Sequence, residues 1–180
     1  MRKFSIPVSR LFALVLCLLP AFAFAGDFDR FAGTFTGAAE FSFDGEVRYR
    51  DMSTTIEPTK DGFVLTWTSV SRKDDGRAKA KTYKIKFAPS VRPNIYGSAM
   101  RTNVFGKAIP LDPLKGDPFV WARLIGDTLS VFSLFIDETG EYEMQEYHRT
   151  LVDQGLELEF LLVRDGKPLK TIKTLLKRAN

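Results

Sequence analysis

The fold of this chain is decided by residues 118–164, PFVWARLIGDTLSVFSLFIDETGEYEMQEYHRTLVDQGLELEFLLVR, where apolar β-formers are interrupted at near-even intervals by turn-forming pairs. These pairs are Gly126-Asp127, Thr139-Gly140 and Gln154-Gly155. Short strands separated by such turns are typical of an antiparallel meander. A sheet this rich in Phe, Trp, Leu and Val must close or pair with a second sheet, because a lone sheet exposes its apolar face and its edges.

The same rhythm extends to both sides of this stretch. Phe35, Phe41 and Phe43 alternate with polar residues, as expected for a half-buried strand. We expect an all-β fold, an antiparallel up-and-down meander closed into a barrel of about eight to ten strands, because closure removes the sheet edges. The expected strands, after one helical turn within 27–31, are 34–43, 47–57, 63–71, 79–87, 95–102, 119–125, 128–136, 141–151, 156–164 and 168–176.

Residues 88–118 interrupt this rhythm with five of the nine prolines. Proline cannot donate a hydrogen bond to a strand ladder, so residues 104–117 are predicted to form an irregular loop. Loops this long often form lids or mouths, and the apolar residues within this one argue against disorder. We expect it near the open mouth of the barrel.

Residues 1–25 have the pattern of a cleaved signal peptide: a basic start, an apolar run and a small-residue site at Ala23-Phe24-Ala25. The apolar run of about 14 residues is shorter than the roughly 20 that a membrane-spanning helix needs. We therefore expect export to a bacterial periplasm or secretion, and one β-barrel domain over residues 26–180 that is not transmembrane after processing. Cys17 is the only cysteine and lies in the leader, so the mature chain would contain no thiol.

Without the leader the chain holds 23 Lys and Arg against 22 Asp and Glu, a balance that argues against nucleic-acid binding. Charge is segregated, however: residues 72–107 hold ten basic and two acidic groups, and residues 137–159 hold eight acidic groups and one basic group. Solvated outer faces on opposite sides of one barrel explain this pattern. The alternative is an acidic partner or anionic lipid headgroups docking around Lys79, Lys81, Lys84 and Lys86.

The segment Phe31-Ala32-Gly33-Thr34-Phe35-Thr36-Gly37 resembles the Gly-x-Trp opening of lipocalins and of the related fatty-acid-binding and avidin-like barrels. Gly33 matches the glycine of that motif, and Phe35 stands where the family has tryptophan. The family packs a late arginine across this tryptophan, and Arg164 and Arg178 are both available for that role. The resemblance implies a barrel with a cavity for a small molecule.

No catalytic or metal signature is present. His148 is the only histidine and no Gly-x-Ser-x-Gly elbow occurs, so a structural or exposed role is expected for His148. Zinc and iron sites need several His or Cys ligands. Glu141, Glu143 and Glu146 could approach Ca²⁺, yet Glu141 and Glu143 share one strand face like a solvated stripe, and the ligand pattern of an EF-hand is absent. We expect neither a metal nor another cofactor.

Two aromatic-x-arginine pairs, Trp121-Ala122-Arg123 and Tyr147-His148-Arg149, each place a guanidinium beside a ring on one strand face. Such a pair can hold an apolar body and an anionic end, and it resembles the arginine and tyrosine of fatty-acid-binding barrels. The hypothesis is that Arg123 or Arg149 anchors an anion inside a cavity. The alternative is that both arginines face outward and pair with glutamates. The predicted cavity lining is Trp67, Tyr96, Met100, Trp121, Phe132, Leu134, Met144 and Phe160.

Three functions fit this sequence. The first is an exported barrel that binds or carries a small apolar or amphipathic molecule, anionic or neutral. The second is a non-catalytic envelope module with a packed interior and charged faces that dock to protein or lipid. The third is a cavity enzyme of isomerase or cyclase type, for which Glu146 or His148 would have to lie inside the cavity.

Overall fold

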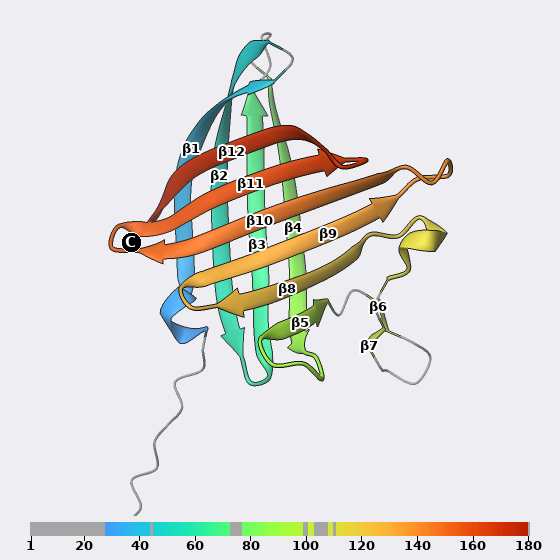
Figure 1. Ribbon diagram of the computed structural model, residues 1–180. Coiled ribbons are helices and arrows are strands. Elements are labelled where there is room, and N and C mark those ends of the chain that lie inside the picture. Colours follow the sequence, from blue (N-terminus) through green and yellow to red (C-terminus); the bar gives the residue numbers. More distant parts are fainter. Residues whose placement is uncertain are drawn as a thin grey trace, which may run out of the picture.

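Ten antiparallel strands close into a barrel in the order β1-β12-β11-β10-β9-β8-β5-β4-β3-β2 (Figure 1). The computed structural model describes residues 28–43, 45–72, 77–98, 101–102, 108–109 and 111–179, so the expected leader and Met100 lie outside the described residues. The all-β meander barrel is confirmed. Its strands are β1 (Gly33–Phe43), β2 (Glu46–Thr59), β3 (Gly62–Arg72), β4 (Ala78–Pro89), β5 (Ile95–Ser98), β8 (Phe119–Ile125), β9 (Thr128–Ile136), β10 (Tyr142–Val152), β11 (Gly155–Arg164) and β12 (Lys167–Arg178).

Alternation along each strand sets which side chains face the interior. In β11, Leu156, Leu158 and Phe160 are buried, whereas Glu157 is exposed. Leu156 lies opposite Leu176 of β12, which is also fully buried. The period-2 pattern therefore placed this strand pair correctly.

The segment between β5 and β8 differs from the expectation. The predicted strand 95–102 ends its barrel pairing at Ser98, and β6 (Arg101–Thr102) pairs instead with β7 (Ala108–Ile109) in a separate two-stranded sheet. A helical turn, η2 (Pro113–Lys115), then lies against β9. The rest of the predicted loop, residues 104–107 and 110, is outside the described residues. Neither η2 nor the leading turn η1 (Asp29–Phe31) has the length of a bilayer-spanning helix, and the described residues contain no helix that does.

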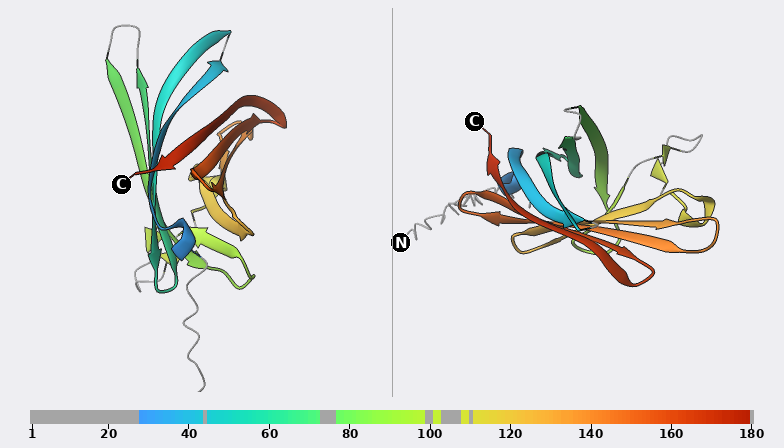
Figure 2. Two further views of the ribbon diagram at one scale, coloured as in Figure 1. Left: turned by 90° about the vertical axis from the view of Figure 1, so that its left-hand side faces the viewer. Right: turned by 90° about the horizontal axis from the view of Figure 1, so that it is seen from above.

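The barrel is closed at one end and splayed at the other. β4 pairs with β5 only from Phe87 to Pro89, and β1 pairs with β12 only at Phe35 and Thr36. Figure 2 shows the far ends of β1–β4 diverging from the layer formed by β8–β12. In the described residues, the first part of β4 thus pairs with β3 alone, and the interior opens beside it.

Aromatic rings fill the closed end. Phe63 lies at the centre of this ring cluster, 4.3 Å from Phe28, 4.8 Å from Phe87 and 5.7 Å from Tyr96 between ring centroids. All four side chains are buried. Burial of large rings contributes much of the stabilisation of a small barrel, so this end is the structural core.

Arg178 rather than Arg164 packs across the start of β1. Its guanidinium carbon lies 4.5 Å from the centroid of the Phe35 ring, and its Nη1 donates a hydrogen bond to the Ala32 carbonyl. Gly33 adopts φ +130°, and a Cβ there would lie 2.5 Å from Arg178 Nη1. Glycine is therefore required at position 33 for the close approach of this arginine. Arg164 instead pairs with Glu143 at 3.0 Å near the other end of the barrel.

Candidate functional site

The inward face becomes polar toward the splayed end. Along β3, the buried Phe63, Leu65 and Trp67 are followed on the same face by Ser69 and Ser71. In the paired strand β4, Lys81 lies opposite Ser69 and Lys79 opposite Ser71. Since successive inward positions share a face, the barrel wall changes from apolar to polar within one strand.

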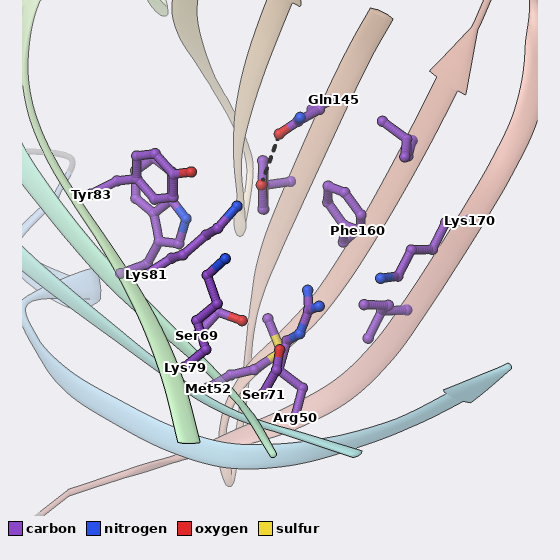
Figure 3. A pocket seen from close by; sticks show the side chains of 14 residues that line it. Arg50, Met52, Ser69, Ser71, Lys79, Lys81, Tyr83, Gln145, Phe160 and Lys170 are labelled. Carbon is purple, nitrogen blue, oxygen red and sulfur yellow. Dashed lines mark hydrogen bonds between the residues drawn. The ribbon is translucent and has the colours of Figure 1, made fainter. Parts of the chain in front are cut away.

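Two adjoining cavities occupy this splayed half, with volumes of about 220 and 310 Å³. They share Trp67, Tyr83, Gln145 and Tyr147 in their walls. Figure 3 shows the first cavity, with side chains from the β3–β4 side facing those from β10–β12. The first cavity is further lined by Arg50, Met52, Ser69, Ser71, Lys79, Lys81, Phe160, Leu162, Lys170 and Ile172. The second is further lined by Ile85, Pro118, Val120, Val131, Ser133, Phe135 and Glu143.

The rings of Trp67, Tyr147 and Phe160, here called the ring floor, line the first cavity on the side of the packed end. Tyr147 lies 5.6 Å from Trp67 and 4.7 Å from Phe160 between ring centroids. Burial raises the pKa of Tyr147 to about 12, so its hydroxyl stays protonated and donates to Gln145 Oε1 at 3.0 Å. The ring floor is therefore uncharged and fixed by one hydrogen bond at its centre.

Arg149 lies beneath the ring floor and is 1% exposed. Its guanidinium carbon is 5.7 Å from the Trp67 ring centroid and 5.4 Å from that of Tyr147, and its Nε donates to Thr54 Oγ1 at 3.4 Å. Its Nη1 has no hydrogen-bond partner, and no described carboxylate forms an ion pair with it. Burial lowers the pKa of Arg149 to about 10. Arg149 faces inward, as one of the two sequence interpretations requires, but it lines neither cavity.

Arg123 lies on the outer face and is exposed, so it is not inside the barrel. Its guanidinium carbon lies 5.6 Å from the Phe132 ring centroid, and the Phe132 ring stacks on Trp121 at 5.1 Å. The hypothesis of an interior anchor at this position is therefore wrong in its geometry. The physical reason is that the alternate residue, Ala122, fills the interior position and is fully buried.

The predicted cavity lining is divided between three places. Trp67 and Phe160 line the first cavity. Tyr96 belongs to the closed end, 4.9 Å from Phe28. Four residues predicted to line the cavity occupy outward positions that alternate with buried or cavity-lining residues, and so do not line it: Trp121, Phe132, Leu134 and Met144.

The four lysines predicted as one docking surface lie on two faces of β4. Lys79 and Lys81 line the first cavity. Lys84 and Lys86 lie at positions that alternate with the buried Ile85 and Phe87, and Lys84 is 3.9 Å from Glu57. Two of the four positive charges therefore face the interior of the splayed half.

His148 takes part in a hydrogen-bonded chain on the outer face. Its Nδ1 lies 2.8 Å from Ser130 Oγ, and its Nε2 lies 3.2 Å from Glu146 Oε2. Ser130 is only 2% exposed, so a substrate could not reach its hydroxyl. His148 and Glu146 line neither of the two cavities. A cavity enzyme would need one of them inside a cavity, and neither lies there. Within the described ranges, His, Cys, Asp and Glu form no group of three or more that could hold a metal.

Arg50 and Lys170 are site residues that the sequence reasoning did not single out. Arg50 precedes the buried Met52 and Thr54 by even steps in β2, and Lys170 precedes the buried Ile172 by two residues in β12. The period-2 pattern would have placed both on the inner face.

A comparison with protein-family models and with curated proteins finds no match for this chain.

Proposed function

We propose that this chain is an exported, lipocalin-like barrel that binds or carries a small apolar or amphipathic molecule in its splayed half. The observation that carries the proposal is the pair of adjoining cavities beside the ring floor. Interior space that side chains leave unfilled is uncommon in a well-packed domain, because voids forfeit packing contacts. Retention of such space is typical of a binding site.

The cavity walls have the mixture that small-molecule sites use. Trp67, Tyr83 and Phe160 supply apolar surface, while Gln145 and the serines supply a few oriented polar groups. Ligand pockets are commonly about 300–1,000 Å³, so the two cavities together suit a small ligand. The ligand would rest on the ring floor and leave through the gap beside β4.

Two further observations support the lipocalin-like part of the proposal. Arg178 packs on Phe35 next to Gly33, as the late arginine of that family packs on its tryptophan. The ten strands follow one another as a meander around the barrel. The proposed location, periplasm or cell exterior, rests on the signal-peptide pattern of residues 1–25 alone.

A second candidate, the interaction module, is favoured by the outer surface. Phe119, Trp121 and Phe132 form a partly exposed aromatic group there, with centroid distances of 5.5 and 5.1 Å. Partly exposed apolar groups of this kind can mark protein or lipid contact sites. Binding to this group would leave the ring floor untouched, so the two candidates predict changes at different tryptophans.

Substitution of Ser69 by phenylalanine is expected to block the first cavity. Ser69 points into the cavity beside Trp67, so a ring there would occupy the space of the ligand. We expect the affinity for a neutral apolar dye, followed by dye fluorescence, to fall by about tenfold or more, equivalent to about 1.4 kcal/mol of lost binding.

The matched control is Thr68→Phe, which places the same ring on the opposite face of the same strand. Thr68 lines neither cavity and bonds Thr82 across the outer face at 2.8 Å. Its affinity for the dye is expected to stay within about twofold of the unmodified protein. Equal losses in both variants, or no uptake of dye by the unmodified protein, would contradict the proposed function.

A further inference from the structure

Four basic side chains gather on the wall of the first cavity: Arg50 of β2, Lys79 and Lys81 of β4, and Lys170 of β12. Figure 3 shows these side chains entering the same space from different strands. No Asp or Glu is among the described residues that line this cavity. Like charges that line one cavity repel one another, so an anion that enters this cavity would be attracted by all four groups and would offset their repulsion.

Arg50 and Lys170 both contact the ring of Phe41. The Arg50 guanidinium carbon lies 5.2 Å from the centroid of Phe41, and Lys170 Nζ lies 3.9 Å from it. Arg50 Nε is buried and has no hydrogen-bond partner among the described residues. A buried donor without a partner is destabilising, so the unfilled donor points to a group supplied from outside the chain.

The pKa of Lys170 reflects its burial and the neighbouring positive charges. Burial, with repulsion from Arg50 and Arg48, lowers the pKa of Lys170 to about 8. An anion placed between these groups would favour the charged lysine and offset the repulsion.

The outer end of the cavity is lined by serine hydroxyl groups and the inner end by aromatic rings. Ser69 and Ser71 lie opposite Lys81 and Lys79 in the β3–β4 pairing, so oxygen-binding donors surround the outer part of the space. Phe160 and Tyr147 line the same cavity on its inner side as part of the ring floor. The cavity thus has a cationic, hydrogen-bonding outer end and an apolar inner end.

We infer that this site takes an amphipathic molecule with an oxyanion head group, a carboxylate, sulfate or phosphate, whose head lies among Arg50, Lys79, Lys81 and Lys170 and whose apolar part rests on the ring floor. Arginine and lysine suit such head groups because they donate charge-assisted hydrogen bonds to anionic oxygens. The inference rests on the proposed function, since it needs the cavity to admit a ligand. It places the head group at the mouth rather than beside Arg149, which the ring floor covers.

The test compares four ligands that share one alkyl chain: decanol, decanoate, decyl sulfate and decyl phosphate. Calorimetric titration measures each ligand against the unmodified protein and against the double variant Lys79→Gln/Lys81→Gln. We expect the anions to bind at least about fivefold more tightly than decanol, and this preference to fall to about twofold or less in the double variant. Affinity for decanol itself should remain within about twofold, which also shows that the variant is folded.

The control is Lys84→Gln/Lys86→Gln, which removes the same charge from the outer face of the same strand. Its preference for the anions should equal that of the unmodified protein. A third variant, Arg149→Met, should also keep the preference. Loss of the preference in Arg149→Met but not in Lys79→Gln/Lys81→Gln would move the head group beneath the ring floor and overturn the inference.

The remaining outcomes separate this inference from the proposed function. Equal binding of decanol and the anions would overturn the inference and leave the binding barrel intact. Absence of binding by all four ligands would contradict both. A further outcome is that the protein associates with anionic phospholipid vesicles through Lys79 and Lys81 but does not bind the monomeric decyl anions. The partner would then be a membrane surface rather than a ligand head group, and the inference would also be overturned.

Discussion

Substitution of Phe63 by alanine is expected to lower the free energy of unfolding by about 3–5 kcal/mol, the range for removal of a fully buried phenylalanine ring. The Phe63 side chain is 0% exposed and contacts the rings of Phe28, Phe87 and Tyr96 at the closed end. The neighbouring rings of Phe87 and Tyr96 belong to the paired strands β4 and β5, and this pairing limits how far they move into the space. Urea denaturation followed by far-UV circular dichroism measures the change.

The matched control is Tyr83→Ala in the splayed half. Tyr83 also stacks on a ring, 5.1 Å from Trp67, but its side chain is 48% exposed. We expect a loss of stability below about 1 kcal/mol, because little buried surface is removed. Dye affinity should fall in Tyr83→Ala, which removes a wall shared by both cavities. Comparable destabilisation by the two substitutions would show that the splayed half is packed as tightly as the closed end.

Substitution of Arg149 by methionine is expected to raise the free energy of unfolding of the unliganded protein by about 1–3 kcal/mol. Arg149 is a buried charge that no described carboxylate pairs, and its lowered pKa, about 10, reflects the cost of removing it from water. The two cation–π contacts, at 5.4 and 5.7 Å, recover only part of this cost. Methionine keeps the length of the side chain and packs well beneath rings.

Arg164→Met is the control for this substitution. Arg164 is exposed and pairs with the partly buried Glu143 at the rim of the second cavity, so its replacement should change stability by no more than about 1 kcal/mol. Urea midpoints of the three proteins give the comparison. A loss of stability in Arg149→Met similar to that of a core truncation would mean that the contacts with Trp67, Tyr147 and Thr54 outweigh desolvation, and that the charge is a structural element.

The strands could be predicted because each depends on local pattern. Residues 156–164 alternate cleanly between Leu or Phe and Glu, and the structure places that strand at Gly155–Arg164. Glycine-containing pairs such as Gly126-Asp127 mark the turns between strands. Closure of the sheet into a barrel could also be predicted, because an open sheet of these apolar strands would leave two edges unpaired.

The facing of β8 and β9 was not predicted, because each strand carries large apolar side chains on both of its faces. The sequence interpretation placed Trp121 and Phe132 in the cavity wall, and both are larger than Ala122 and Val131 at the alternate positions. The structure places Ala122 and Val131 in the interior, where they are opposite one another and buried. Close packing across the barrel admits small side chains there, and this constraint depends on contacts remote in sequence.

The choice between Arg164 and Arg178 also required three dimensions. Both arginines lie near the end of a predicted strand, and no local signal separates them. Only the β1–β12 pairing brings Arg178 opposite Phe35. The cluster of Arg50, Lys79, Lys81 and Lys170 likewise joins three strands that are far apart in the chain.

The two tryptophans provide the most direct test of the central claim, that the splayed half of the barrel admits a small ligand. Trp67 lines both cavities, and Trp121 lies on the outer face. Titration of the ¹⁵N-labelled protein with decanoate should shift the indole N–H signal of Trp67 in a saturable manner and leave that of Trp121 in place. A saturable shift of the Trp121 signal alone, or no shift of either signal, would contradict the claim.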